Sequence, residues 1–260
     1  MQYATDTVLN LISDSVQTGS LSQNAIRIIF WIAKALILRL QSFSEVLERL
    51  LGLLPNINYG TAVARGFGVL LAPDEAFSKE NGARMRLLAK QKVFSVCIPQ
   101  ISKSYRDAET SVKSNYLIAM SGILRFVPTE VIMQEVDTLL PLLLQSLELE
   151  DQDVKAATMQ SLFVVSSESP AAVEGHVGSI ISRLLKAASN AETNDINVRL
   201  GALKCLKIFP KKIKESTLLP LRNMVTRGLM ASLDDAKRDT RKEAVDCRAA
   251  WLDLDEPQSD

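Results

Sequence analysis

The residues best suited to catalysis are few in this 260-residue chain, and they lie far apart. A single histidine, His176, would have to serve any system in which an imidazole activates a serine or cysteine nucleophile. It lies at the start of an expected helix, where a solvated or capping role is the default. The three cysteines, Cys97, Cys205 and Cys247, cannot supply a four-thiolate zinc or iron–sulfur site. We therefore expect a non-enzyme without a metal or cofactor.

The remaining reactive or flexible residues favour structural roles. Cys97 and Cys205 fall on apolar helix faces, which indicates core packing, whereas the position of Cys247 favours neither packing nor exposure. The Gly66-x-Gly68 pair lies inside an apolar helical stretch and lacks the strand–turn–helix context of a phosphate-binding loop. Three widely separated cysteines without a C-x-x-C pair indicate a reducing compartment.

The composition excludes several other classes of protein. The net charge is zero and 47% of the residues are hydrophobic, which argues against intrinsic disorder. A neutral chain is not, as a whole, a polyanion binder. The most apolar stretch, residues 25–40, is interrupted by Arg27, Lys34 and Arg39, so we expect a buried helix there and no membrane span.

Two sequence patterns recur at intervals of 41–44 residues and define the elements that would position any site. The first has apolar residues at i, i+3, i+4, i+7 and i+8, with Gln100 and Gly228 as exceptions at i+7, which is one face of an amphipathic helix, and it starts at Val93, Val136, Val177 and Leu221. The second opens another helix after acidic residues that suit a helix N-terminus. Its marks are Val112-Lys113, Val154-Lys155, Val198-Arg199 and Thr240-Arg241.

Two helices in every 40–47 residues, approximately, are typical of HEAT and armadillo repeats, whose hairpins stack because one hairpin cannot bury both of its faces. The sequence therefore predicts an all-α fold, a HEAT-repeat α-solenoid, over residues 1–252. We expect irregular helices within 20–72 and a disordered acidic tail over 253–260. The regular repeats are predicted at about 84–127, 128–169, 170–210 and 211–252.

The helix predicted near residues 24–40 is apolar on nearly every side, so it should be covered on every side. Nothing in residues 1–20 looks large enough to cover it, and we expect the chain to be a piece of a longer solenoid. The alternative is that residues 4–16 fold back as a cap. Without a cover, this helix could also pair two chains as a homodimer.

Charge is distributed unevenly along the chain. Residues 129–175 carry nine acidic residues and one basic residue, whereas residues 199–248 carry thirteen basic and six acidic residues. Such zones orient partners more than they add affinity. The alternative is that the charges are ordinary helix surfaces and that positions 113, 155, 199 and 241 form a ladder between repeats.

The last predicted helix, roughly residues 235–251, is the sharpest candidate for a partner-binding surface, since arginine and tryptophan are common in interface hot spots. The same features would serve a terminal cap. The candidate residues are Asp234, Asp235, Lys237, Arg238, Arg241, Lys242, Arg248 and Trp251.

The stretch LDDAKRDTRKEAVDCRAAW, residues 233–251, resembles the C-terminal signature of the MMS-nineteen family, called Met-eighteen in some fungi. The segments 31–39, 91–99 and 113–117 are also similar to that family, and the resemblance covers residues 20–252. One departure is Thr240, where a β-branched apolar residue is expected.

The resemblance implies a C-terminal HEAT module of a scaffold in the cytosolic iron–sulfur assembly targeting complex, found in cytoplasm and nucleus. The implied partners are a MIP-eighteen-type subunit, a β-propeller subunit, and iron–sulfur apoproteins such as helicases and polymerases of DNA repair and replication. Direct nucleic-acid or membrane binding is not expected. Two alternatives stay open, namely a HEAT adaptor of a transport, phosphatase or transcription system, and a nucleic-acid-binding module that uses the basic C-terminal zone.

Overall fold

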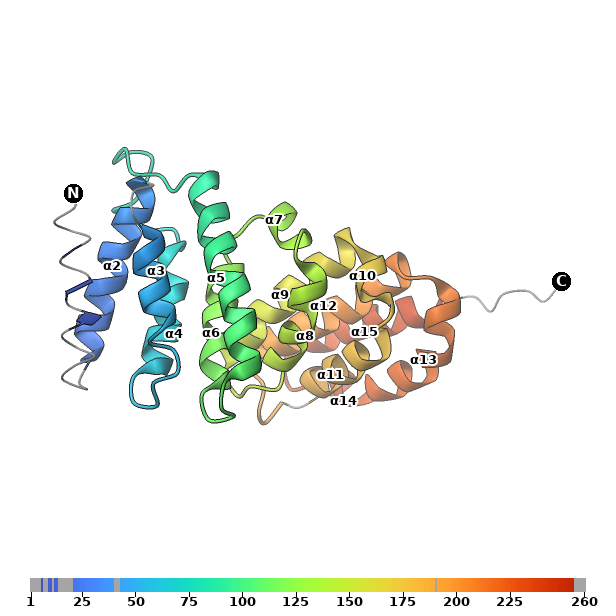
Figure 1. The fold of residues 1–260 in the computed structure, drawn as a ribbon. Coiled ribbons are helices and arrows are strands. Elements are labelled where there is room, and N and C mark those ends of the chain that lie inside the picture. Colours follow the sequence, from blue (N-terminus) through green and yellow to red (C-terminus); the bar gives the residue numbers. More distant parts are fainter. Residues whose placement is uncertain are drawn as a thin grey trace. The chain divides into compact units, whose positions relative to one another are not determined.

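The structure, a computed structural model, describes residues 6, 9–10, 12–13, 21–39, 43–189 and 191–254. In these residues all regular secondary structure is helical, and there are no strands (Figure 1). The chain divides into two compact units, residues 1–134 and 135–260. Each unit is therefore described separately.

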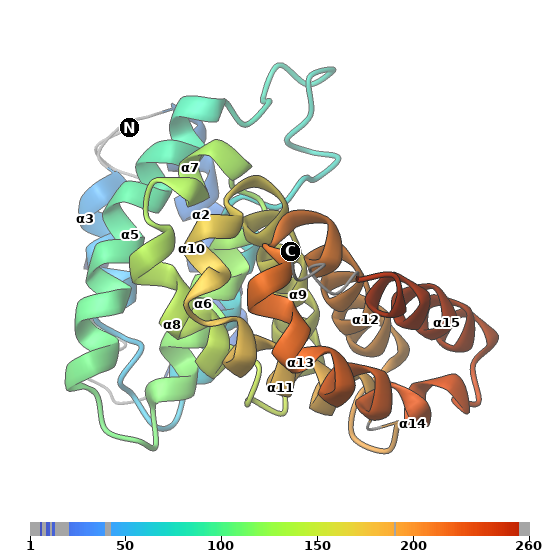
Figure 2. The same ribbon diagram turned by 90° about the vertical axis from the view of Figure 1, so that its right-hand side faces the viewer.

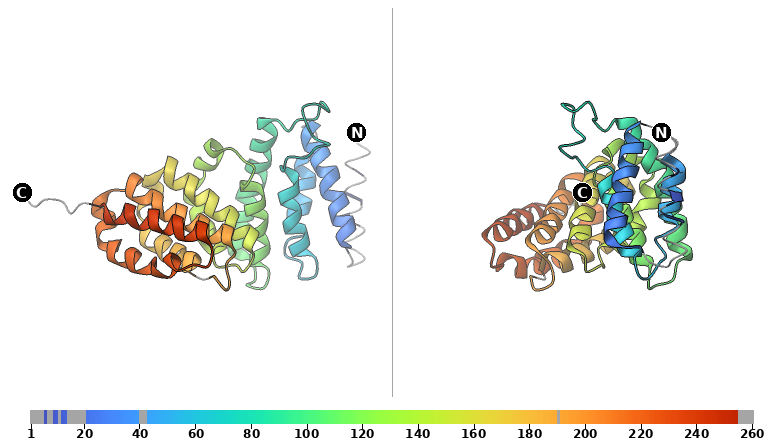
Figure 3. Two further views of the ribbon diagram at one scale, coloured as in Figure 1. Left: turned by 180° about the vertical axis from the view of Figure 1, so that it is seen from behind. Right: turned by 90° about the vertical axis from the view of Figure 1, so that its left-hand side faces the viewer.

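The first unit is a stack of helices in which helices consecutive in the chain run in opposite directions (Figure 1). Helix α4 packs against both α2 and α6, and α5 packs against α3 and α6 (Figures 1 and 3). A long loop, which joins α4 to α5, projects beyond the ends of the neighbouring helices (Figure 2). The helices are α2 (Gln23–Arg39), α3 (Phe43–Leu51), α4 (Gly60–Leu70), α5 (Leu87–Asp107), α6 (Lys113–Leu124) and α7 (Thr129–Met133).

The second unit repeats a hairpin in which the second helices pack side by side. Helix α12 packs between α9 and α15, while α11 and α13 form the neighbouring row (Figure 2). The helices are α8 (Val136–Ser146), α9 (Gln152–Glu168), α10 (Pro170–Glu174), α11 (Val177–Ser189), α12 (Ile196–Lys212), α13 (Glu215–Gly228), α14 (Met230–Leu233) and α15 (Arg238–Leu252).

Acidic residues begin two of the repeated second helices, as the sequence predicts. The carboxylate of Asp151 accepts a hydrogen bond from the Val154 backbone N–H at 3.1 Å, and that of Asp195 accepts one from Val198 at 2.9 Å. Each bond satisfies a donor that the first helical turn would otherwise leave unpaired. In the last repeat Asp235 precedes α15 but forms an ion pair instead.

The structure adds features that the periodic pattern does not predict. The short helices α7, α10 and α14 contain five, five and four residues. The boundary between the two units falls inside the repeat predicted at about 128–169, so α7 belongs to the first unit and α8 and α9 belong to the second.

Helix α2 is only partly covered by the described residues. Phe30 and Ile37 are buried, whereas Ile28 is 56% exposed and Trp31 is 38% exposed. The segment 4–16, predicted as an alternative cover, lies largely outside the described residues, as does most of the predicted tail at 253–260.

Two glycines bring helices of the first unit into close contact. A Cβ atom on Gly66 would lie 2.2 Å from the ring of Phe30, and a Cβ atom on Gly122 would lie 2.7 Å from the backbone nitrogen of Gly68. Glycine is therefore needed at these positions for close packing of α4 on α2 and α6. The Gly66-x-Gly68 pair lies within helix α4.

Candidate partner-docking surface

Helix α15 presents a basic stripe to solvent. Arg238, Lys242 and Val245 occupy positions i, i+4 and i+7, which is one face of a helix. Both basic side chains are exposed, and Val245 is 56% exposed. Neither cation forms an ion pair with an acidic side chain among the described residues. We call Lys237, Arg238, Lys242 and Val245 the α15 stripe.

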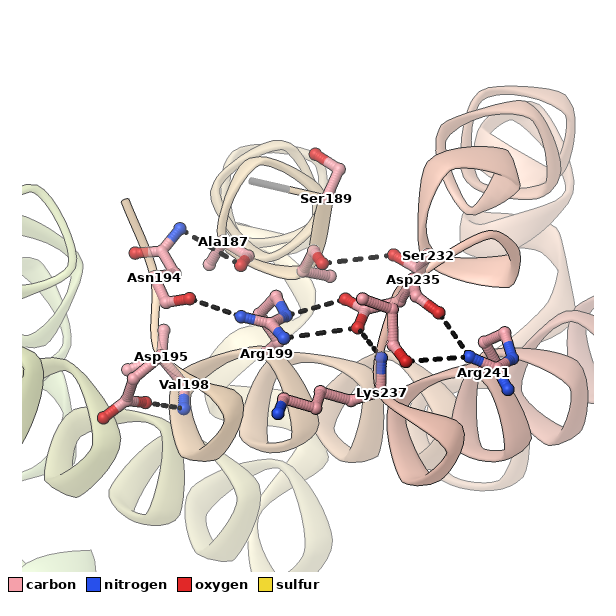
Figure 4. A network of polar contacts seen from close by, with 12 residues as sticks. Ala187, Ser189, Asn194, Asp195, Val198, Arg199, Ser232, Asp235, Lys237 and Arg241 are labelled. Carbon is pink, nitrogen blue, oxygen red and sulfur yellow. Dashed lines mark hydrogen bonds and ion pairs between the residues drawn. The ribbon is translucent and has the colours of Figure 1, made fainter. Parts of the chain in front are cut away.

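Asp235, by contrast, belongs to a buried network between hairpins (Figure 4). The Arg199 Nε atom donates to Asp235 Oδ2 at 2.8 Å, and the Arg199 and Asp235 side chains are only 6% and 3% exposed. Asp235 also accepts a hydrogen bond from the Lys237 backbone N–H at 2.7 Å, which fixes the turn before α15. The Arg199 guanidinium donates a further bond to the carbonyl oxygen of Asn194. The Asp235 carboxylate therefore stabilises the stack and is not free for a partner.

Two other candidates on α15 are also engaged inside the chain. Arg241 Nη1 donates to the carbonyl oxygens of Asp235, at 2.6 Å, and Ala236, at 3.1 Å. Trp251 is fully buried and donates its indole N–H to the Leu206 carbonyl oxygen at 2.8 Å. These side chains hold α15 in place, so a partner docked on this conformation would not contact the tryptophan.

The eight candidate residues thus fall into two groups. Arg248 is half-buried, with a buried Nε that has no hydrogen-bond partner among the described atoms, and it joins the residues engaged in packing. The exposed candidates, which remain available for contact, are Asp234, Lys237, Arg238 and Lys242.

The basic residues at positions 113, 155, 199 and 241 could alternatively form a ladder of contacts between repeats. Two of these four positions, 155 and 199, make such contacts. Lys155 Nζ donates to Asn194 Oδ1 of the next hairpin at 2.8 Å, and Arg199 pairs with Asp235 of the hairpin after that. Lys113 instead lies 5.0 Å from the ring centre of Tyr105, and Arg241 bonds within its own repeat. Lys155 and Arg199 therefore connect neighbouring hairpins of the second unit, whereas Arg238 and Lys242 of α15 are among its exposed cations that form no ion pair in the described part of the chain.

The residues with chemical reactivity do not converge. His176 is exposed between α10 and α11, and all three cysteines are buried. Burial raises the pKa of Cys205 to about 12, and burial together with the nearby Glu243 raises that of Cys247 to about 12. Across the part of the chain that the structure describes, no group of three or more histidine, cysteine and acidic side chains could hold a metal ion. None of the helices in the described ranges is both long and apolar enough to cross a membrane.

Sequence reasoning missed a pocket in the first unit. It is formed where the loop after α4 meets Lys34 of α2, Lys90 of α5 and Arg125 after α6. The loop falls between the irregular helices predicted within 20–72 and the first regular repeat predicted from about residue 84, where the sequence shows no periodicity. The basic residues on both sides of it were the available signal.

Comparison with solved structures gives the class of fold. Computationally designed armadillo repeat proteins for modular peptide recognition superpose with a TM-score of 0.65 and 17% identity, covering 94% of this chain and 98% of theirs. An engineered protein gives a TM-score of 0.64 at 17% identity, with the same coverage of both chains. The chain is thus an all-helical protein of the HEAT and armadillo solenoid class, which confirms the predicted fold.

Comparison with protein families identifies the group within that class. Residues 1–210 match the family model MMS19_C, described as "RNAPII transcription regulator C-terminal". The "MMS19 nucleotide excision repair protein homolog" of Bos taurus is 34% identical over 98% of this chain and 25% of its own length, and that of Homo sapiens is 33% identical with the same coverage. The "DNA repair/transcription protein mms19" of Schizosaccharomyces pombe is 34% identical over 92% of this chain and 24% of its own length. The chain belongs to the MMS19 family, as the resemblance of its motifs predicts.

The chain spans about a quarter of the length of these curated relatives. The alignments that cover 98% of the chain extend beyond residue 210 and include α15.

Proposed function

We propose that this chain is a non-catalytic docking module of the cytosolic iron–sulfur assembly targeting complex. It belongs to a family whose curated members are named for nucleotide excision repair, DNA repair and transcription. In this proposal the module helps to deliver clusters to apoproteins such as helicases and polymerases, in the cytoplasm and nucleus. The cluster is the cargo, and the chain docks carriers and clients without ligating iron.

The observation that carries the proposal is the α15 stripe. Its cations have no acidic partner within the described chain, whereas the buried cation Arg199 is paired. An exposed face with unpaired cations and one exposed valine supports docking of an acidic protein surface, because complementary charge steers association and fixes orientation. The proposed partner at this face is the MIP-eighteen-type subunit, with the β-propeller subunit joining the same complex.

The test is reconstitution of the chain with the two proposed subunits. Charge reversal of the stripe, K237E/R238E/K242E, should weaken the complex by about tenfold or more and reduce its salt dependence. The matched control R49E/K103E/R106E makes the same change of charge at exposed positions of the first unit and should leave binding unchanged. Size-exclusion chromatography and calorimetry measure the complex, and circular dichroism checks helix content.

Two results would count against this function. Failure of the unaltered chain to bind either subunit would favour a HEAT adaptor of another system. Tight binding of duplex DNA that weakens steeply with salt and is lost in K237E/R238E/K242E would favour a nucleic-acid-binding module. No aromatic side chain accompanies the exposed cations of α15, because Trp251 is buried, so the surface lacks the stacking groups of a single-strand platform.

A further inference from the structure

The first unit contains a pocket of about 480 Å³, which lies within the range of about 300–1,000 Å³ typical of ligand sites. Its walls come from α2, from the loop after α4, from the start of α5 and from the segment after α6. Side chains from four parts of the sequence therefore converge on one volume. The residues used below are Lys34, Phe77, Arg84, Lys90, Arg125 and Phe126.

The pocket is lined by four cations and by no acidic residue. Arg84 and Arg125 are exposed, and Lys90 is half-buried. None of these three forms an ion pair with an acidic side chain in the described part of the chain. Several unpaired positive charges around one concave surface attract an anion and raise its local concentration.

Lys34 places a buried charge at the edge of this pocket. The residue is only 1% exposed, and its ammonium donates one hydrogen bond, to the Ala72 carbonyl oxygen at 2.8 Å. The ammonium also lies 5.0 Å from the ring centre of Trp31 and 5.3 Å from that of Phe77, which are cation–π distances. Burial lowers the pKa of Lys34, and the nearby Asp74 raises it in part. A negatively charged ligand in the pocket would further stabilise this ammonium.

Apolar surface lies beside the cations. Phe77 stacks on Trp31, with ring centres 5.6 Å apart and an angle of 22° between the planes. The guanidinium carbon of Arg125 lies over the ring of Phe126, 5.5 Å from the centre of that ring. Both phenylalanines are half-buried and line the pocket, which can therefore bury an apolar side chain next to the charged groups.

We propose that this pocket binds an acidic peptide segment in which an apolar side chain lies next to carboxylates. Arg84, Lys90 and Arg125 pair with the carboxylates, and the rings of Phe77 and Phe126 contact the apolar side chain. This surface belongs to the first unit and is independent of the α15 stripe in the second unit. The peptide-binding proposal therefore goes beyond the function proposed above, and it is tested by separate variants.

A peptide fits this site better than a nucleic acid. A single-stranded nucleic acid requires a basic groove that follows its backbone over several nucleotides. Here the cations are confined to one pocket, and the loop that forms its rim also carries Asp74, Glu75 and Glu80, which would repel a continuing row of phosphates. A short acidic segment can place its carboxylates in the pocket without extending along the acidic rim.

The experiment uses the whole chain and a fluorescein-labelled, amidated octapeptide of aspartate and glutamate that carries one phenylalanine and one leucine. Fluorescence anisotropy should show saturable binding that weakens at least tenfold between about 50 and about 500 mM NaCl. The variant R84E/R125E should weaken binding by about tenfold or more. The control R49E/K103E, which reverses two exposed charges outside the pocket, should bind as the unaltered chain does.

Further probes separate the contributions of charge and apolar contact. The octapeptide with asparagine and glutamine in place of its acids, and the acidic octapeptide with alanine in place of phenylalanine and leucine, should each bind at least tenfold more weakly. If R84E/R125E loses helix content, the milder R125Q replaces it, with an expected weakening of about threefold.

Three outcomes overturn the proposal. The acidic peptide shows no saturable binding, R84E/R125E binds it as tightly as R49E/K103E does, or a thymidine oligonucleotide binds more tightly than the peptide and is displaced by the same pocket variants. Loss of subunit binding by K237E/R238E/K242E with retained peptide binding would show that the two surfaces act independently.

Discussion

Thr240 is fully buried in α15, and its hydroxyl has no hydrogen-bond partner among the described atoms. It occupies the position at which the three preceding repeats have valine, namely Val112, Val154 and Val198. A buried hydroxyl without a partner costs stability, because folding removes it from water without replacing its hydrogen bonds. The one departure from the family motif is therefore expected to lower the stability of the fold at this position.

We predict that Thr240→Val stabilises the second unit by about 1 kcal/mol, because it removes the unpaired hydroxyl. The matched control is Thr226→Val, in which the lost hydroxyl donates to the Arg222 carbonyl oxygen at 3.0 Å. The control should not be stabilised. Urea unfolding followed by circular dichroism measures both, and equal effects of the two substitutions would contradict the explanation.

The three buried thiols should be inert in the folded chain. Burial raises the pKa of each cysteine thiol, to about 12 for Cys205 and Cys247, so almost no reactive thiolate forms near neutral pH. We predict negligible labelling by iodoacetamide at pH 8 and complete labelling in urea, as measured by mass spectrometry.

The raised pKa values of the cysteine thiols also determine how stability changes with pH. The folded state holds the thiol protons more tightly than the unfolded state, so the contribution is fully present below the ordinary thiol pKa of 9.0. It is lost as the pH rises from there towards about 12. Rapid labelling of any thiol at pH 8 in the folded chain would show that its burial is interrupted by opening of the hairpins.

At the scale of the helices, glycine determines how closely neighbours approach. The Gly66 position faces the Phe30 ring, and Gly122 faces the backbone of Gly68, so α2, α4 and α6 pack with little space between them. Close-packed interiors transmit the cost of even one added methyl group.

We predict that Gly66→Ala and Gly122→Ala each destabilise the first unit by about 1–3 kcal/mol through overpacking. Gly178→Ala in α11 is the control, since its added Cβ would meet nothing within 4 Å, and it should stabilise the chain by up to about 1 kcal/mol through helix propensity. Thermal unfolding measures the series. A stabilised Gly122→Ala would show that α4 and α6 can separate at little cost.

The helices were the most predictable part of the molecule. Their apolar stripes repeat every 41–44 residues because each hairpin must bury the same face against its neighbours. The spacing of apolar residues therefore indicates which helix faces are buried. The helices α7, α10 and α14 were not predictable in this way, because five residues or fewer are too short to show a period.

The candidate surfaces were less predictable, because they depend on contacts distant in sequence. Whether Asp235 is exposed depends on Arg199, which lies 36 positions earlier and reaches it only when the hairpins stack. The burial of Trp251 depends likewise on the Leu206 carbonyl. The charge count identified the basic zone at residues 199–248, but only the packed structure shows which of its cations are exposed and which are buried.

At the scale of the whole molecule, buried polar contacts connect successive hairpins of the second unit. The Arg199–Asp235 pair is buried and is supplemented by the bond from Ser232 to the Ala188 carbonyl oxygen at 3.2 Å. Removing one member of a buried pair leaves an uncompensated charge, whereas removing both can be nearly neutral.

We predict that Arg199→Met destabilises the second unit by about 3–5 kcal/mol, and that R199M/D235L recovers most of this loss. Loss of the exposed Lys186–Glu148 pair by Lys186→Met should change stability by less than about 1 kcal/mol. Urea unfolding of all three variants tests the comparison. If R199M/D235L is as unstable as R199M, the contact between these hairpins depends on the hydrogen bonds of Arg199 to the backbone and not on the charge pair.

The placement of the two tryptophans gives the chain a reporter in each unit. Trp31 is 38% exposed in the first unit, and Trp251 is completely enclosed in the second. Their emission should therefore contain a long-wavelength component that acrylamide quenches and a short-wavelength component that it does not. With Trp31→Phe, the remaining fluorescence follows the second unit alone, so comparing the melting of this variant with that of the unaltered chain reveals whether the two units unfold together or one after the other.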